Sequence, residues 1–316
     1  MIIYYFREHV LHDLYPHPEN ASRIESIKDE LRRYLDFVEV EPDFDEDVIT
    51  SVHSPRYVRL IKSVCSKIRS YGFLDPDTYV VRGTYRAAVL AANLLIRAYE
   101  VKNKHIFALT RPPGHHAERD EAGGFCIFNN VAILARRAVN DELSVLILDF
   151  DYHHGNGTQS LLPENAVFIS IHRYGVYPGT GHYYERDRGN VYNIPLMFTK
   201  VNDAEYFYVF RKIVLPVVQD KNPDLIIVSM GFDCQKGDLI GDWHLESVWR
   251  NIFKDLRSYR IIFALEGGYN PQGILRGILE IERGLRGNDI SLGGKIRDEF
   301  RLYIESLVKH FNLSKS

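Results

Sequence analysis

The sequence predicts an α/β fold, built as a three-layer, open, mostly parallel β-sheet with helices on both faces. Three observations lead to this prediction. Short apolar runs alternate with longer helical patterns along the 316-residue chain. Several of these runs are apolar at consecutive positions, which is typical of strands buried on both faces of a parallel sheet. Polar, glycine-rich segments follow the runs, where an open parallel sheet binds its ligands.

The individual elements are expected at the following positions. Strands are expected at Ile2–Phe6, Ile106–Leu109, Val145–Phe150, Val167–Ile171, Leu225–Met230 and Ile261–Leu265. Helices are expected at Thr84–Val101, Asn129–Val139, Ala204–Val218, Leu245–Leu256 and Gly273–Arg283. Because the chain has no internal repeat, low-complexity segment or Pro/Ser-rich linker, residues 1–316 are expected to form a single domain.

The composition is that of an ordinary globular protein, with 45% hydrophobic and 26% charged residues. The formal net charge is -3 with both signs spread along the chain, so direct nucleic-acid binding is not predicted. No apolar run suggests a signal peptide or a membrane span, so no membrane association is predicted. Cys65, Cys126 and Cys234 lie far apart without a C-x-x-C pair, which favours a reducing cytoplasm over a disulfide framework.

Polar segments follow five of the expected strands. In chain order they read RPPGHH, DYHHGNG, HRYGVYPGTG, GFDCQKGD and EGGYN. Because the carboxyl ends of parallel strands meet at one edge of the sheet, these segments predict one shared site.

The second and fourth segments suggest a metal site. Asp149, Asp151 and His153 occupy alternate positions, so their side chains share one face if the chain is extended. Asp233, after a later strand, can supply a third ligand beside Asp151 and His153. One His and two carboxylates suit zinc with an open position for water and substrate. Taken alone, D-x-D-x-H is equally compatible with acids that cap a helix or bind backbone amides.

Two further features suggest catalysis. His115 and His116 follow two prolines and a glycine, and adjacent histidines in a stiff loop can act as general acid and base. A solvated or metal-binding pair is the alternative. Tyr269 follows two glycines that allow close approach to a site, where a phenol hydroxyl can stabilise an oxyanion. The alternative is a Tyr that only packs.

Together these segments resemble the histone deacetylase superfamily, which includes class II-like histone deacetylases, acetylpolyamine amidohydrolases and acetoin-utilisation proteins. The resemblance covers nearly the whole chain. It is carried by His17–Asn20 with Arg23, Val52–Tyr57, Asp75–Thr78, Arg111–Ala117, Gly123–Asn130, Asp149–Thr158, Tyr177–Gly181, Gly231–Asp238 and Glu266–Asn270. It implies the arginase–deacetylase fold and one zinc ion per chain.

The resemblance also implies roles for single residues. The zinc ligands would be Asp151, His153 and Asp233. The catalytic histidines would be His115, partnered by Asp149, and His116, partnered by Asn156, with Tyr269 polarising the carbonyl. The substrate tunnel would be lined by Gly124, Phe125 and Tyr177, with Asp77 or Asp75 as a rim carboxylate. A potassium ion would be held by Asp149, Asp151, His153, Ser170 and Ile171.

The implied function is a zinc-dependent hydrolase that removes an acetyl group from an acetylated amine, first of all acetyl-lysine in proteins. Acetylpolyamines and small metabolites stay open as substrates, and so does the oligomeric state. A binuclear manganese hydrolase of the arginase type is disfavoured, because His153–Asn156 offers too few carboxylates for a second metal. A non-catalytic acetyl-ligand sensor is disfavoured because every catalytic position matches the family.

Overall fold

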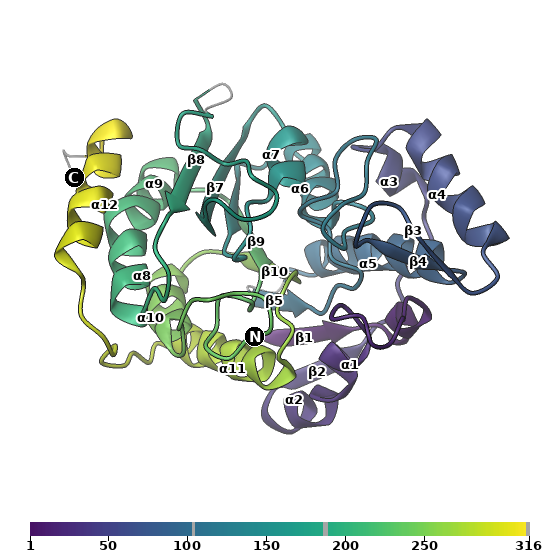
Figure 1. Cartoon of the computed structure of the whole chain (residues 1–316), viewed down its shortest axis with the longest axis horizontal. Helices are drawn as coiled ribbons and strands as arrows, with labels where there is room; N and C mark the ends of the chain where they lie inside the picture. Colours follow the sequence, from purple (N-terminus) through teal and green to yellow (C-terminus); the bar gives the residue numbers. More distant parts are fainter. Residues whose placement is uncertain (103–104, 186–188, 314–316) are drawn as a thin grey trace.

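The computed structural model describes residues 1–102, 105–185 and 189–313. Its centre is an eight-stranded parallel sheet with the strand order β2-β1-β5-β10-β9-β6-β7-β8 (Figure 1). The strands are β1 (Ile2–Tyr5), β2 (Asp36–Glu39), β5 (His105–Ala108), β6 (Val145–Asp149), β7 (Ala166–Arg173), β8 (Val191–Leu196), β9 (Leu225–Met230) and β10 (Ile261–Leu265). A separate antiparallel hairpin pairs β3 (Tyr71–Phe73) with β4 (Tyr79–Val81).

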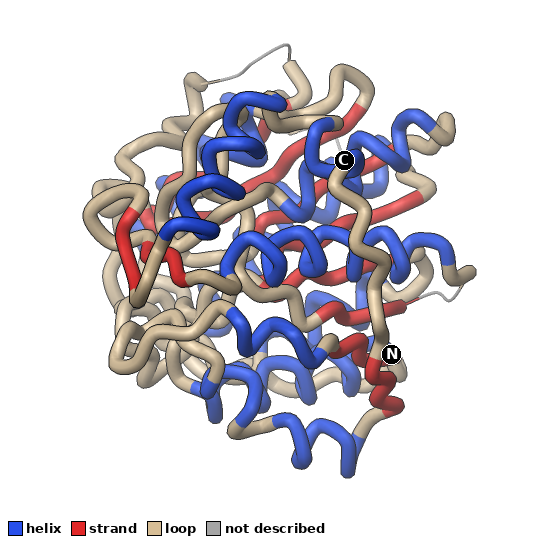
Figure 2. Tube along the Cα trace, turned by 90° about the vertical axis from the view of Figure 1, so that its right-hand side faces the viewer, coloured by secondary structure: helices blue, strands red, loops and turns tan. Residues whose placement is uncertain are grey.

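Helices cover both faces of the sheet, which confirms the predicted three-layer α/β class (Figure 2). Their bounds are η1 (Arg7–Leu11), α1 (Ser22–Glu25), α2 (Lys28–Tyr34), α3 (Asp47–Thr50), α4 (Pro55–Lys67), α5 (Thr84–Glu100), α6 (Asn130–Asn140), α7 (Asn156–Ser160), α8 (Asp203–Val209), η2 (Phe210–Val214), α9 (Leu215–Lys221), α10 (Val248–Leu256), α11 (Pro271–Leu285) and α12 (Asp298–His310). None of the helices within these described residues is long and apolar enough to cross a membrane.

The strands divide the apolar interior into two cores. Ile226 and Val228 of β9 pack with α8, α10, α11 and α12 on one face of the sheet. Leu225 and Ile227 of the same strand pack with α4, α5 and α6 on the other face. This alternation follows from the two-residue period of a strand, and burial on both faces explains why β9 is apolar at most positions.

Two strands at the edges of the sheet escaped the sequence prediction. β2 reads DFVE and is mostly exposed, so it lacks the apolar run expected of a buried strand. β8 contains Asn193 and Pro195, and a proline removes a backbone donor that a central strand would need. An edge position tolerates both features because only one neighbouring strand has to be paired.

The predicted helix Leu245–Leu256 begins three residues late, at Val248. Leu245 instead forms a parallel bridge with Gln235. The carboxylate of Asp203 accepts hydrogen bonds from the backbone amides of Glu246 and Ser247, at 2.9 and 3.0 Å. These long-range contacts hold the segment outside the helix, and local periodicity does not reveal them. The three cysteines are free and buried.

We expect His53 to make the folding stability depend on pH. Its Nδ1 lies 2.8 Å from the carbonyl oxygen of Glu118, and the amide of Asn129 donates to its Nε2 at 2.8 Å. Nδ1 therefore carries the proton and the ring is neutral. Burial lowers the pKa of His53 from 6.5 to about 4, against the opposing influence of the Glu118 and Arg119 carbonyls and Asp120.

Above pH 6.5 the ring is neutral in both states and its full contribution is present. As the pH falls towards about 4, the unfolded chain takes up a proton that the folded protein excludes, so about 3 kcal/mol of stability is lost. Urea unfolding at several pH values, compared between the wild type and His53→Gln, measures this loss. The amide of the variant offers a donor and an acceptor but does not titrate. If the free energy of unfolding changed with pH in the same way in both proteins, the role given to His53 would be contradicted.

Candidate active site

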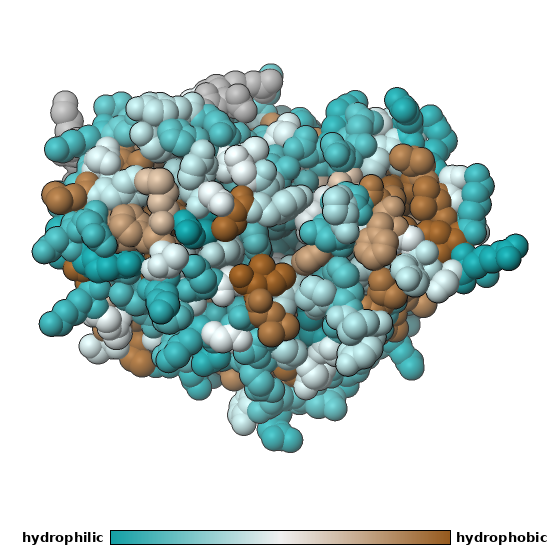
Figure 3. Space-filling model, viewed as in Figure 1, coloured by the Kyte–Doolittle hydropathy of each residue, from teal (hydrophilic) through white to brown (hydrophobic). Residues whose placement is uncertain are grey.

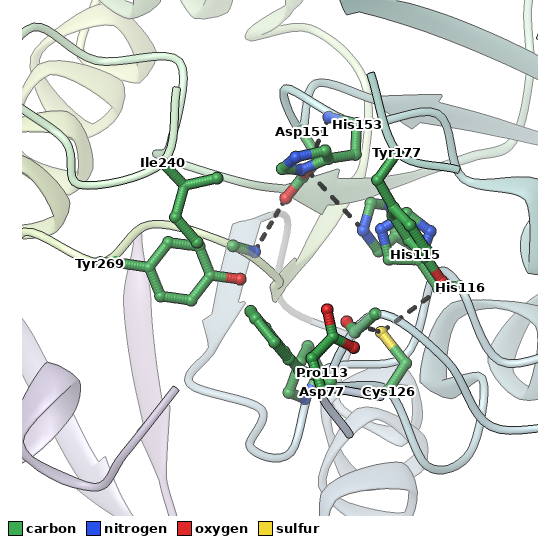
Figure 4. A pocket seen from close by; sticks show the side chains of 13 residues that line it. Asp77, Pro113, His115, His116, Cys126, Asp151, His153, Tyr177, Ile240 and Tyr269 are labelled. Atoms are coloured by element: carbon green, nitrogen blue, oxygen red, sulfur yellow. Dashed lines mark hydrogen bonds and ion pairs between the residues drawn. The ribbon is translucent and has the colours of Figure 1, made fainter. Parts of the chain in front are cut away.

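The polar segments that follow the strands meet at the carboxyl edge of the sheet, where the structure contains a cavity of about 160 Å³ (Figure 4). It is lined by Asp77, Pro113, His115, His116, Gly124, Phe125, Cys126, Asp151, His153, Tyr177, Ile240, Gly267 and Tyr269. Each of the five predicted segments contributes at least one lining or directly supporting residue, so one shared site is observed. The face seen in Figure 3 is mostly hydrophilic, with a group of apolar side chains beside a hollow near its centre.

Asp151, His153 and Asp233 come together at this cavity, with potential ligand atoms within 4.8 Å of one another. The expected extended geometry is wrong, however. β6 ends at Asp149, and the chain bends through residues 151–153. Asp151 Oδ1 accepts a hydrogen bond from the His153 amide at 2.9 Å, which brings the two side chains together within the bend. Asp149 points elsewhere, towards His115.

The three side chains fit a cation between them. His153 Nδ1 lies 3.2 Å from Asp151 Oδ1 and 3.0 Å from Asp233 Oδ2. One ring nitrogen carries at most one proton for these two oxygens, and Asp233 Oδ2 is left buried without a hydrogen bond. Two buried carboxylates and one imidazole, with an acceptor unsatisfied, are suited to a bound divalent cation such as zinc.

Electrostatics at the cluster favour positive charge. Burial disfavours the imidazolium form of His153, but the hydrogen bond with Asp151 and the negative charges of Asp233 and Asp151 outweigh burial and raise its pKa to about 10. The two carboxylates thus favour a positive charge at the position between them. A divalent cation supplies this charge directly and takes the unprotonated ring as a ligand.

His115 and His116 lie next to each other, with ring centroids 4.0 Å apart. His115 Nδ1 is 3.1 Å from Asp149 Oδ2, and His115 Nε2 is 3.8 Å from Asp151 Oδ1. Burial opposes charge on His115, but Asp151 and Asp149 outweigh it and raise the pKa to about 10. The surroundings of His115 therefore favour its charged form.

His116 has the opposite environment. Its Nδ1 lies 2.8 Å from the side-chain oxygen of Asn156, which is uncharged. Burial, then the positive charges of His115 and His153, hold the pKa of His116 well below its ordinary range. The surroundings thus favour charge on His115 and disfavour it on the adjacent His116, which is the pattern of a divided acid and base role.

Tyr269 lines the cavity opposite the histidines. Its backbone amide donates to Asp238 Oδ2 at 2.6 Å, and its ring packs edge-to-face on Phe125 at 5.7 Å. The guanidinium carbon of Arg23 lies 4.8 Å from the ring centroid. Burial raises the pKa of Tyr269 well above 10, so the phenol keeps its proton as a hydrogen-bond donor.

The loop before Tyr269 is held by a buried ionic cluster. Arg23 donates to the carbonyl oxygens of Gly268 and Glu266, both at 2.6 Å. Glu19 pairs with Arg23 at 3.1 Å and with Arg111 at 2.7 Å. Burial opposes ionisation of Glu19, but Arg111, His12 and Arg23 outweigh it and hold the carboxyl pKa well below 4.5. Paired in this way, the charges fix the Gly267–Tyr269 backbone at the cavity floor.

The predicted tunnel residues form the cavity wall. The Tyr177 ring stands edge-on to His116 with centroids 5.0 Å apart. Gly124 has φ +53, and a Cβ there would lie 2.4 Å from Cδ2 of His116, so only glycine fits between the wall and this histidine. Asp77 lines the cavity, whereas Asp75 accepts hydrogen bonds from the backbone amides of Asp77 and Thr78.

Ser170 and Ile171 lie in β7 beside the end of β6, where Ser170 pairs in register with Asp149. Both are buried, and the Ser170 hydroxyl lies 2.9 Å from His172 Nδ1. A potassium ion at this position stays a prediction.

Several neighbours of the site were not assigned a function from the sequence. Glu266 accepts from the amides of Gly114 and His115 at 2.7 and 3.2 Å, and so braces the histidine loop. Asp238 holds Tyr269, and Ile240 lines the cavity while 39% exposed. Glu266 and Asp238 lie in two of the polar segments named above, and Ile240 lies two residues beyond Asp238. Their contacts with other segments are revealed only by the folded chain.

The family model for the histone deacetylase domain matches residues 17–285. An uncharacterized protein of Methanocaldococcus jannaschii is 36% identical over 272 residues, which cover 80% of this chain and 78% of that protein. A probable deacetylase of Methanothermobacter thermautotrophicus is 33% identical over 310 residues, 92% of each chain. Histone deacetylase clr3 of Schizosaccharomyces pombe is 39% identical over 203 residues, 58% of this chain but only 30% of the yeast protein.

The structural comparison agrees. The crystal structure of the HDA15 HD domain superposes with a TM-score of 0.88 at 29% identity, covering 98% of this chain and 94% of that one. The match extends over nearly all of the sheet and helices described above. The chain therefore belongs to the histone deacetylase family, whose members are hydrolytic deacetylases.

Proposed function

We propose that the protein is a zinc-dependent amidohydrolase that removes the acetyl group from acetyl-lysine in a protein or peptide. The observation that carries the proposal is the cluster of Asp151, His153 and Asp233 at a cavity that His115 and His116 also line. One imidazole and two carboxylates are a ligand set for catalytic zinc with an open position. Bound zinc would polarise the acetyl carbonyl and make bound water more acidic.

The residues of the chain would divide the proton transfers. His116, kept neutral by burial and by its cationic neighbours, takes a proton from the attacking water and later delivers one to the leaving amine. His115, held by Asp149, contributes a fixed positive charge beside the reacting group. Tyr269 donates its phenol proton to the oxygen that becomes negative in the transition state.

The shape of the cavity supports an alkyl-amide substrate. Phe125 and Tyr177 present aromatic surface along the wall, and Ile240 adds an aliphatic side chain. Such walls suit an uncharged, unbranched stem like the four methylenes of lysine. Asp77 also lines the cavity. Its carboxylate would accept a hydrogen bond from a backbone amide of the peptide that carries the acetyl-lysine.

Kinetics on a substrate panel test the proposal. Zinc-loaded protein is assayed with acetyl-lysine peptides, acetylated polyamines and free acetylated amino acids, before and after removal of metal by a chelator. We expect the highest kcat/KM on the peptides, loss of activity with the chelator and recovery with added zinc. Activity that survives complete metal removal would contradict the mechanism, and a preference for polyamines would contradict the substrate.

A further inference from the structure

His116 is connected to a carboxylate outside the cavity through a side-chain amide. His116 Nδ1 lies 2.8 Å from Asn156 Oδ1, and Asn156 Nδ2 donates to Glu118 Oε1, also at 2.8 Å. Glu118 does not line the active-site cavity. It lines a separate surface pocket together with Arg119 and Arg136.

Glu118 fixes the donor and acceptor directions in this series of hydrogen bonds. An ionised carboxylate only accepts hydrogen bonds, so Glu118 requires the amino group of Asn156 to face it. The amide oxygen of Asn156 must then face His116, and it requires a proton on Nδ1. In a neutral imidazole the other nitrogen is then an acceptor, so Nε2 of His116 is left with a free lone pair.

Backbone contacts around Asn156 hold its side-chain amide next to His116. A Cβ on Gly157 would lie 2.3 Å from the Ala117 carbonyl oxygen, so the first turn of α7 packs directly on the histidine loop. The amide of Thr158 donates to the His115 carbonyl oxygen at 3.1 Å. Asn156 is therefore held beside His116, and the rotation of its amide group decides which ring nitrogen carries the proton.

Glu118 is itself anchored by its main chain. Its amide donates to the Glu121 carbonyl at 2.9 Å, and its carbonyl oxygen lies 2.8 Å from His53 Nδ1. The backbone position of the carboxylate is thus set independently of Asn156. With an apolar residue at position 118, either rotation of the Asn156 amide would be allowed. The rotated form would donate to Nδ1 and place the proton on Nε2.

We infer that Glu118 is a positioning residue that fixes the tautomer of His116, with the proton on Nδ1 and Nε2 free to accept. The inference rests on the proposed function in one respect, because a base at Nε2 matters for catalysis only if His116 is the general base. The tautomer itself is a property of the folded protein that can be measured without substrate.

Two substitutions of Glu118 and one matched control at position 121 test this. Glu118→Gln keeps an acceptor oxygen, so we expect kcat within about threefold of the wild type. Glu118→Lys replaces the acceptor by a donor, which turns the Asn156 amide, and kcat should fall by about 100-fold with little change in KM. Glu121→Lys is the matched control for charge, because this exposed acid lies in the same loop and contributes only a backbone oxygen.

A double variant separates the tautomer from general damage. In Glu118→Lys/Asn156→Asp, the carboxylate at position 156 can accept from the new ammonium group and from His116 Nδ1 together. We expect kcat of the double variant to be at least tenfold higher than kcat of Glu118→Lys alone. No recovery, with both proteins folded, would overturn the inference.

Nitrogen-15 NMR of the zinc-loaded protein at pH 8 reads the tautomer directly, with the His116 signals identified from a His116→Ala spectrum. We expect a protonated Nδ1 in the wild type and in Glu118→Gln, and a protonated Nε2 in Glu118→Lys. An unchanged Nδ1 proton in Glu118→Lys would refute the role of Glu118, whatever the activity. A changed tautomer in a protein without deacetylase activity would instead refute the proposed function alone.

Discussion

Replacing Tyr269 by Phe is expected to lower kcat by about 100- to 1,000-fold while the protein stays folded and keeps its metal. The reason is the loss of one hydrogen-bond donor to the developing oxyanion. Removing one such donor lowers kcat by about 100- to 1,000-fold in enzymes that transfer acyl groups. The ring should stay in place, because Asp238 binds the backbone amide of this residue and the side chains of Arg23 and Phe125 pack against the ring.

Three measurements on Tyr269→Phe decide the matter: kcat on an acetyl-lysine peptide, zinc content and the thermal midpoint. Tyr71→Phe serves as the control, since that ring is 56% exposed on the hairpin. Full activity in the Tyr269 variant would remove the phenol from the mechanism. A parallel loss of zinc would show that the substitution acts on the metal site instead.

Replacing Asp233 by Ala is expected to abolish stoichiometric zinc binding and, with it, activity. The side chain contributes one of three clustered ligand atoms, and its Oδ2 is buried without a hydrogen bond. Loss of a residue that merely supports a ligand costs about 10- to 100-fold in metal affinity, so loss of the ligand should cost more.

Asp233→Asn refines this experiment. Asp233 Oδ1 also accepts from the Tyr152 amide at 3.0 Å, and an Asn can keep this bond while losing the charge at the metal. Zinc content by elemental analysis after dialysis should be near zero for both variants and near one per chain for the wild type. The control is Asp242→Asn, an exposed acid nearby. Undiminished zinc in Asp233→Ala would eliminate the proposed ligand set.

The sequence predicted most of the central sheet because buried parallel strands are recognisable locally. β6, β9 and β10 are apolar at nearly all positions, and their observed bounds agree with the predicted runs to within one residue. The exposed edge strand β2 has no such pattern and was missed. Its pairing with β1 is fixed by a neighbouring strand rather than by its own residues.

The identities of the candidate site residues were also available from the sequence, because their polar segments follow apolar strands. The partners within the site were not available from spacing. Alternation along an extended strand placed Asp149 with Asp151 and His153, whereas the bend after β6 directs Asp149 to His115. The pairing of Asn156 with Glu118 spans 38 residues and joins a helix to a loop.

The sequence by itself thus determined the fold class, the sheet edge that carries the site and the residue types gathered there. These follow from local hydrophobic patterns and from the common direction of parallel strands. Tertiary structure decided which carboxylate faces which imidazole, which histidine has surroundings that favour charge, and how the Asn156 amide is turned. Such properties depend on burial and on distances between segments far apart along the chain, and local patterns do not encode them.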